Sequence, residues 1–245
     1  MTTIKKQNKK PLAKRGKSTV RGKIFRFLFK MMVWFLGISI LLVIAFRWIP
    51  VPFTPLMLIR SIENKIDNKE VKCEHDWVPI EAISINMQKA VIASEDGTFL
   101  NHNGFDLKAM KLAYKNNSKG KKLKGGSTIS QQTAKNVFLW QGRSYFRKGL
   151  EAYFTLLIEL FWGKERIMEV YLNSIEMGNG VYGVEAASQF WYKKTARELT
   201  KSDAAGIAAI LPNPRKFKAS NSSSFIELRK SRIIKRMRYL NKLAY

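Results

Sequence analysis

Two adjacent carboxylates stand where an apolar segment gives way to a polar one. The stretch VIASEDGTFLNHNGFD, residues 91–106, runs from apolar side chains into Glu95 and Asp96, with His102 and Gly104 shortly after. A carboxylate within hydrogen-bond reach of a reacting hydroxyl can take its proton as a general base. The same residues also suit an ordinary polar turn, so the pattern by itself leaves both interpretations open.

A second group of charges lies inside a strongly apolar segment. Residues 144–163 predict a helix that is apolar almost all round, which is typical of a central buried helix. Within it, Arg147, Lys148 and Glu151 stand at positions i, i+1 and i+4, so their side chains lie close together. An exposed salt-bridged stripe is one interpretation. Because this helix has little other polar surface, the pattern favours a charged cluster that lines a cleft.

The segment KGGSTISQQTAKN, residues 124–136, places glycines, hydroxyls, amides and a lysine around a helix start. The helix is expected to begin near Ser127, where Thr128 and Gln131 have the spacing of a capping box. Its free N–H groups can bind an anion, and Lys135 projects together with Gln131, one turn earlier. A capped helix after a flexible loop explains the segment equally well. It is not a phosphate-binding P-loop, because the GxxxxGK[ST] order is absent.

The N-terminal part of the chain predicts that these elements are held at a membrane. Residues 1–30 hold eleven Lys or Arg and no acid, and residues 31–49 are almost entirely apolar. Such a segment can cross ~30 Å of hydrocarbon, and the positive-inside rule keeps the basic tail in the cytoplasm. The flanking charges argue against a buried core helix, and RWIPVP offers no signal-peptide cleavage site. We expect a basic cytoplasmic tail, one transmembrane anchor and an extracytoplasmic domain over 50–245.

That domain is predicted to be mainly α. Beyond residue 50 the apolar periodicity is helical, with no convincing strand alternation and no internal repeat. The glycines of GNGVYG, residues 178–183, predict a tight turn with close packing. Further helices are expected at about 164–176, 183–192, 202–211 and 225–243.

Charge and composition narrow the classes of partner. The formal net charge of +26 favours an anionic partner, which could be nucleic acid, anionic lipid or a phosphorylated substrate. Residues 1–24 hold no aromatic side chain to stack on bases, and an anchor brings the basic tail to anionic lipid headgroups instead. Cys73 is the only cysteine, so an intrachain disulfide is excluded, and with two histidines it disfavours a structural zinc site.

Five segments in this order resemble the family of peptidoglycan glycosyltransferases (glycosyltransferase family 51). They are EDGTFLNHNG, KGGSTISQQTAKN, RKGLE, RIMEVYLNSIEMGNGVYGVEAAS and AAILPNPRKF. The resemblance covers residues 75–220, and the combination of motifs is highly specific. One departure is Ser130, where the family commonly has threonine; the hydroxyl is kept. Because the chain leaves no room for a penicillin-binding domain, we expect the monofunctional form of the family.

The resemblance implies a mainly α, lysozyme-like fold and a glycan polymerase of the bacterial inner (cytoplasmic) membrane. It implies that the growing glycan, carried on undecaprenyl diphosphate as leaving group, is transferred to the 4-hydroxyl of lipid II with inversion. Glu95 matches the family's catalytic glutamate, and Glu151 matches its second glutamate. The implied substrate-binding residues are Ser127, Thr128, Gln131, Gln132, Lys135, Arg143, Arg147 and Lys148.

The implied reaction needs no cofactor and no metal-binding residues, and it leaves open whether Mg²⁺ or Mn²⁺ assists the diphosphate. Expected partners are lipid II, the growing glycan strand and membrane lipid, with cell-wall synthesis or division proteins as further candidates and no nucleic acid. Two other classes compete. One is a lysozyme-like hydrolase with Glu95 and Glu151 as its acid–base pair, and the other is a noncatalytic, membrane-anchored nucleic-acid-binding protein. The cationic residues and the five motifs favour the transferase.

Overall fold

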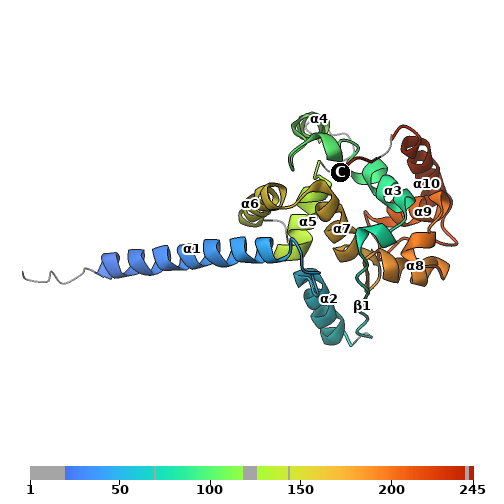
Figure 1. Cartoon of the computed structure of the whole chain (residues 1–245). Coiled ribbons are helices and arrows are strands. Elements are labelled where there is room, and N and C mark those ends of the chain that lie inside the picture. The colour runs from blue at the N-terminus through green and yellow to red at the C-terminus, as the bar shows by residue number, and fades with distance from the viewer. Residues whose placement is uncertain (1–19, 69, 118–125, 143, 241–242) are drawn as a thin grey trace, which may run out of the picture. The chain divides into compact units, whose positions relative to one another are not determined.

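The computed structural model of the chain divides into two compact units (Figure 1). These units are Met1–Leu42 and Val43–Tyr245. The residues that the structure describes are 20–68, 70–117, 126–142, 144–240 and 243–245. Most of the predicted basic tail, and Arg143 of the predicted site, therefore lie outside the described residues.

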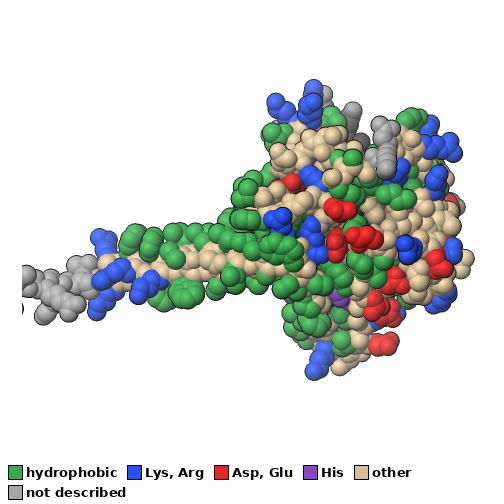
Figure 2. Space-filling view, viewed as in Figure 1, with side chains coloured by type: hydrophobic (Ala, Val, Ile, Leu, Met, Phe, Trp, Pro, Cys, Tyr) green, Lys and Arg blue, Asp and Glu red, His purple; other side chains and the backbone are tan. Residues whose placement is uncertain are grey.

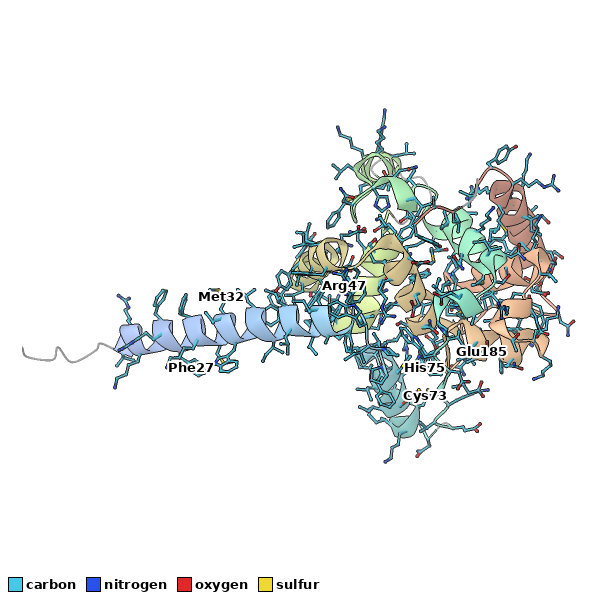
Figure 3. All side chains as sticks on the ribbon, viewed as in Figure 1. Phe27, Met32, Arg47, Cys73, His75 and Glu185 are labelled. Carbon is cyan, nitrogen blue, oxygen red and sulfur yellow. The ribbon has the colours of Figure 1, made fainter. Side chains whose placement is uncertain are left out.

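Helix α1 (Val20–Ala45) makes up the described part of the first unit, and its last turn belongs to the second. Most of its apolar side chains are exposed (Figure 2), and Phe27 and Met32 project from different sides (Figure 3). Among the described residues it is the one helix long and apolar enough to cross a membrane. The helix begins before the apolar segment predicted at 31–49, because lysine and arginine are themselves good helix formers.

The second unit is built mainly from helices, as the sequence predicted. The α-helices are α2 (Pro55–Ile66), α3 (Ile85–Glu95), α4 (Leu107–Asn117), α5 (Ile129–Phe138), α6 (Tyr145–Phe161), α7 (Lys164–Ser174), α8 (Val184–Tyr192), α9 (Lys201–Ile210) and α10 (Ser224–Met237). Short 3₁₀ helices lie at η1 (Ile80–Ala82), η2 (Phe99–Asn101) and η3 (Ala196–Glu198). The expected helix starts agree with these to within two residues, whereas α10 ends earlier than expected.

Polar side chains fix where the helices of the candidate site begin. Ser84 before α3 and Ser144 before α6 each accept a hydrogen bond from an N–H in the first turn of the helix that follows. The predicted capping box of α5 is present. The Thr128 hydroxyl accepts from Gln131 N (3.2 Å), and the Gln131 side chain accepts from Thr128 N (3.0 Å). Local sequence therefore determines the starts of α3, α5 and α6.

A small sheet, which the sequence did not predict, packs against α8. Its strands are β1 (Glu74–His75), β2 (Glu176–Gly178) and β3 (Val181–Tyr182) in the order β1-β3-β2, with β1 parallel and β2 antiparallel to β3. Strands of two or three residues are too short to show alternation in the sequence. The predicted tight turn is confirmed, because Gly180 has φ +72° and a Cβ there would lie 2.4 Å from the carbonyl oxygen of Lys72.

The core of the second unit lies between two helix groups. Helix α9 packs against α3 and α10, while α5 packs against α6 and α7 (Figure 1). One continuous cluster of buried side chains joins the groups, including Ile92 of α3, Ile129 of α5, Met168 of α7 and Ile207 of α9. Residues 204–210 of α9 are all buried, so α9 occupies the centre.

Helix α6 is not the central buried helix that its composition predicted. Its inner face, with Phe154 and Ile158, is buried, and Phe154 stacks on Phe138 of α5. On its outer face, the exposed fractions of Leu156 and Leu160 are 58% and 74%. Apolar periodicity identifies side chains that avoid water but not what covers them. An outward apolar face and a buried one therefore look alike in the sequence.

Candidate active site

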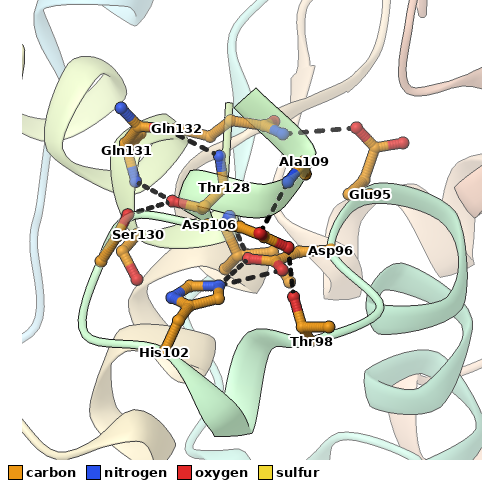
Figure 4. Close-up of polar contacts among 12 residues, drawn as sticks. Glu95, Asp96, Thr98, His102, Asp106, Ala109, Thr128, Ser130, Gln131 and Gln132 are labelled. Atoms are coloured by element: carbon orange, nitrogen blue, oxygen red, sulfur yellow. Dashed lines mark hydrogen bonds and ion pairs between the residues drawn. The ribbon is translucent and has the colours of Figure 1, made fainter. Parts of the chain in front are cut away.

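Glu95 ends α3, and side chains from three parts of the chain hold its carboxylate. The Ser94 hydroxyl donates to Oε1 (2.8 Å), and Gln132 Nε2 on α5 donates to Oε2 (3.3 Å; Figure 4). Arg229 of α10 places Nη2 3.7 Å from Oε1. The Glu95 side chain keeps 16% of its surface exposed. The carboxylate is thus fixed in place but still open to a bound hydroxyl, as a general base requires.

The neighbouring acid, Asp96, ties the end of α3 to the start of α5. Its Oδ2 accepts from the backbone N of Ile129 (3.0 Å), and His102 Nε2 donates to both carboxylate oxygens at 3.0 Å (Figure 4). The first N–H groups of a helix have no partner within the helix, so this carboxylate supplies one. The Asp96 side chain is only 3% exposed. Asp96 therefore positions the segment between α3 and α5, while Glu95 remains the reactive candidate.

Two of the predicted substrate-binding residues use their polar atoms within the fold. Thr128 and Gln131 are buried in the capping box, and the Thr128 hydroxyl also donates to the carbonyl of Gly104 (2.6 Å). Ser127, in contrast, is exposed and borders a cavity of about 90 Å³ together with Glu95. The structure thus places Ser127 at the surface of the site and gives Thr128 and Gln131 the task of holding α5 in place.

The predicted charged residues gather where α5 meets α6. Arg147 Nη1 donates to Glu151 Oε2 (2.7 Å), and Lys148 pairs with Oε1 of the same carboxylate. Burial lowers the pKa of Lys135; the charge of Glu151 opposes this, and the charges of Arg147 and Lys148 add to it. Lys135, Arg147, Lys148 and Glu151 form the cationic cluster. Three cations and one carboxylate leave it with two positive charges, so it can hold an anion.

A cavity of about 280 Å³ lies beside Lys135 of this cluster and beside Gln132, the α5 side chain that contacts Glu95. Its lining includes Gln132 and Lys135 of α5, Tyr171 of α7 and the turn at 212–214. Gln132 links this cavity to Glu95. Its Oε1 accepts a hydrogen bond from the Tyr171 hydroxyl (3.3 Å), and its Nε2 donates one to Glu95. Burial, and then the charges of Glu95 and Asp96, raise the pKa of Tyr171 well above its ordinary value. The Tyr171 hydroxyl therefore keeps its proton and remains a donor to Gln132.

Sequence reasoning missed three residues of this arrangement. Ser94 is adjacent to Glu95, so its position in the chain could have suggested a local donor. Tyr171 lies in α7, whose apolar side chains indicate only a core helix. Arg229 lies far along the chain, in α10. Only the packing of α10 on α3 brings Arg229 to Glu95. Within the described part of the chain, no group of three or more His, Cys, Asp or Glu is placed to hold a metal ion.

The chain is similar to known proteins over most of its length. A family model described as Transglycosylase matches residues 63–238. The biosynthetic peptidoglycan transglycosylase of Bdellovibrio bacteriovorus is 51% identical over 212 residues, which cover 86% of this chain and 85% of that protein. Proteins of the same name from Caulobacter vibrioides and Bacteroides thetaiotaomicron are 53% and 48% identical over 191 and 220 residues. These matches cover 78% and 90% of this chain, and 81% and 89% of the respective relatives.

Proposed function

Because this chain belongs to the transglycosylase family, we propose that it is a peptidoglycan glycan-chain polymerase that uses lipid II. The growing glycan, linked to undecaprenyl diphosphate, is transferred to the 4-hydroxyl of lipid II with inversion. The predicted family, enzyme class and mainly α, lysozyme-like fold are confirmed by the family match. The observation that carries the proposal is that Gln132 contacts Glu95 and lines the same cavity as Lys135 of the cationic cluster.

In the proposed step Glu95 is the general base. As the acceptor 4-hydroxyl oxygen bonds to C1 of the donor, its proton passes to a carboxylate oxygen of Glu95. The bond from C1 to the diphosphate oxygen breaks, and its electron pair leaves with the lipid diphosphate. Attack on the face opposite the leaving group inverts C1. Ser94 and Gln132 hold the carboxylate in the orientation that this transfer needs.

The cationic cluster stabilises the leaving group. A diphosphate gains negative charge as the bond to C1 breaks, and cations placed beforehand at that point lower the barrier. Lys135, Arg147 and Lys148 supply those charges, and Glu151 orients the last two through its ion pairs. Ser127 and Arg143 are proposed as further substrate contacts. We propose that Thr128 and Gln131 contribute by holding α5 rather than by touching substrate.

The geometry does not favour the hydrolase alternative. A glycosidase acid–base pair needs a second carboxyl that can deliver a proton to the leaving oxygen. Both oxygens of Glu151 are engaged by cations, and its side chain is only 4% exposed. Two positive charges beside the cleft suit a diphosphate, which a hydrolase acting on an uncharged glycosidic bond would not need. The proposed step uses no resident cofactor and is compatible with a Mg²⁺ or Mn²⁺ ion that accompanies the diphosphate.

We place the enzyme in the inner membrane with its catalytic unit on the extracytoplasmic side. Supporting this are the apolar helix α1 and the basic residues that precede it, which the positive-inside rule retains in the cytoplasm. Within the second unit, Trp162 Nε1 donates to the carbonyl of Val43 (2.7 Å), in the last turn of α1. We propose that Leu156 and Leu160, which are exposed on the outer face of α6, contact lipid.

Polymerisation of lipid II by the purified full chain tests the proposal. In detergent, labelled lipid II should be converted to long lipid-linked glycan. Absence of polymer under conditions in which the protein is folded would overturn the proposed function. Cleavage of preformed glycan strands, without polymerisation of lipid II, would instead identify the hydrolase.

A further inference from the structure

A cavity of about 520 Å³ lies where α3, α9 and α10 meet. These three helices pack against one another (Figure 1). The volume falls within the range of about 300–1,000 Å³ that is typical of ligand sites. Glu95, Gln132 and the cationic cluster do not line this cavity. It is therefore separate from the candidate active site.

Four apolar side chains line the cavity, namely Ile85, Ile234, Met237 and Leu240. Met237 is buried, and Ile234 and Leu240 are partly buried against the core. The exposed fraction of Ile85 is 49%, so this side chain offers apolar surface that a bound group can cover.

Three cations complete the lining. They are Lys89 of α3, Lys201 of α9 and Arg238, the residue after α10. Lys89 Nζ donates to the carbonyl of Leu240 (3.2 Å), while Lys201 and Arg238 are exposed. None of the three is in an ion pair with an acid of the described residues. Three positive charges thus share an apolar cavity without a counter-charge from the part of the chain that the structure describes.

The acid nearest in sequence to Lys201 has another partner. Asp203, in the first turn of α9, pairs with Lys194 (2.7 Å). No Asp or Glu of the described residues lines the cavity. Ile85 and Lys201 are also the first residues of α3 and α9, and the N-terminus of a helix adds partial positive charge. The cavity therefore suits an anionic ligand that also carries apolar groups.

We propose that this cavity is a docking site for an acidic, apolar peptide segment of a partner protein. A large apolar side chain of the segment covers Ile85 in the cavity, and its Asp or Glu residues pair with Lys201 and Arg238. Such complementary charge speeds association and disfavours basic partners. A free inorganic anion fits less well, because it covers none of the apolar lining. The proposal goes beyond the proposed function, since docking of a peptide requires no glycan substrate.

The docking site and the candidate base lie at opposite ends of α3. Ile85 begins this helix and Glu95 ends it, so ~15 Å separates them at 1.5 Å per residue over the helix of 11 residues. A docked segment therefore leaves Glu95 open to substrate, and the partner can stay bound during catalysis.

Selection of peptides by the full-length protein in non-ionic detergent tests the docking site. The probe is a library of random 12-residue peptides displayed on phage. Selected peptides should combine Asp or Glu with a large apolar residue. Synthetic copies should lose most of their affinity when their carboxylates are replaced by amides or when salt is added.

Two variants locate the binding. The double variant Lys201→Gln, Arg238→Gln should bind the selected peptides about tenfold more weakly, as expected for two lost ion pairs at a partly open site. Ile85→Ser should also weaken binding, because it removes apolar surface from the lining. All three residues are exposed, so the variants should keep the fold, which thermal unfolding checks.

The matched control is the double variant Lys218→Gln, Lys235→Gln. It removes the same two charges from exposed positions that do not line the cavity. This control should bind the selected peptides with wild-type affinity. A diphosphate-lipid mimic should not displace the peptides, because the candidate active site lies at the other end of α3.

Four outcomes would overturn the docking site. They are the absence of acidic, apolar peptides from the selection, wild-type affinity in the Lys201, Arg238 variant, an equal loss in the control variant, and displacement by the diphosphate-lipid mimic. Binding of a fluorescent anionic phospholipid that depends on Lys201 and Arg238, without peptide binding, would identify a lipid site instead. Polymerisation of lipid II is scored separately, so a failure of the proposed function is distinguishable from a failure of the docking site.

Discussion

Gln132 Nε2 lies 3.3 Å from the carboxylate of Glu95, although 37 residues separate them in the chain. The same amide accepts a hydrogen bond from the buried Tyr171 hydroxyl. Because that hydroxyl donates to Oε1, the orientation of the amide is fixed, and its NH₂ must point to Glu95. The Gln132 side chain thus links the buried Tyr171 to Glu95, the candidate base.

Replacing Glu95 by glutamine should abolish most turnover. The variant keeps the size of the side chain but loses its basicity, so polymerisation should fall by about 10²–10⁴-fold, the contribution typical of a general base. The measurement is the initial rate of lipid II polymerisation, with thermal unfolding as the check on folding. Glu81→Gln, at an exposed glutamate away from the site, should keep the wild-type rate. A near-normal rate in Glu95→Gln would remove Glu95 from the mechanism.

Asp96→Ala should mainly reduce stability. The change leaves the N–H of Ile129 and Nε2 of His102 without their buried acceptor. A stranded buried donor costs about 1–3 kcal/mol, so the free energy of unfolding should fall by roughly that amount or more. Denaturant unfolding in detergent measures it. An unchanged stability would show that water or a neighbour replaces the carboxylate and that Asp96 does not tie α3 to α5.

Lys135→Met should weaken handling of the diphosphate and not of the sugar. One charge-assisted hydrogen bond is worth about 1.5–3 kcal/mol, so binding of a diphosphate-lipid mimic should fall by roughly 10- to 100-fold. Binding of an uncharged disaccharide-peptide should hardly change, and Arg143→Met should behave in the same way. Equal losses for both ligands would mean that these residues support the fold or the sugar site instead.

The pH dependence of turnover should reveal the titration of Lys135. The pKa of Lys135 is lowered below its ordinary value of 10.5, chiefly by burial. Its positive charge is present below the lowered pKa and is lost as the pH rises through it, so turnover should decline on the alkaline side at a pH below 10.5. Arginine keeps its charge at any such pH. In Lys135→Arg, whatever activity remains should lack this alkaline decline. A decline at the same pH in that variant would assign it to another group.

Truncations that differ by seven residues should separate anchoring from folding. Removal of residues 1–42 should leave the second unit folded but reduce flotation with phospholipid vesicles. Removal of 1–49 also takes away the acceptors of Trp162 Nε1 and of Arg166, which donates to the carbonyls of Phe46 and Ile49. The longer truncation should therefore have a lower free energy of unfolding than the shorter one, by about 1–3 kcal/mol for each buried donor left without an acceptor. Equal stability of the two would show that the exit segment is not part of the folded unit.

The sequence by itself determined the local features of this protein. The capping box at Thr128 and Gln131 and the pairing of Arg147 with Glu151 involve residues three or four apart, so helix geometry alone places them. The apolar anchor and the ordered motifs are likewise readable without a structure, because length, charge and residue identity are properties of the chain.

Tertiary structure alone decided the long-range relationships. Glu95 and Asp96 are adjacent and chemically alike, yet packing turns Asp96 inward to Ile129, whereas the Glu95 side chain stays 16% exposed beside Gln132. Arg229 reaches Glu95 only because α10 packs on α3, and the outward apolar face of α6 is set by what lies on its other side. Such contacts depend on the free energy gained when many side chains from distant parts of the chain are buried together. No local pattern in the sequence specifies which side chains those are.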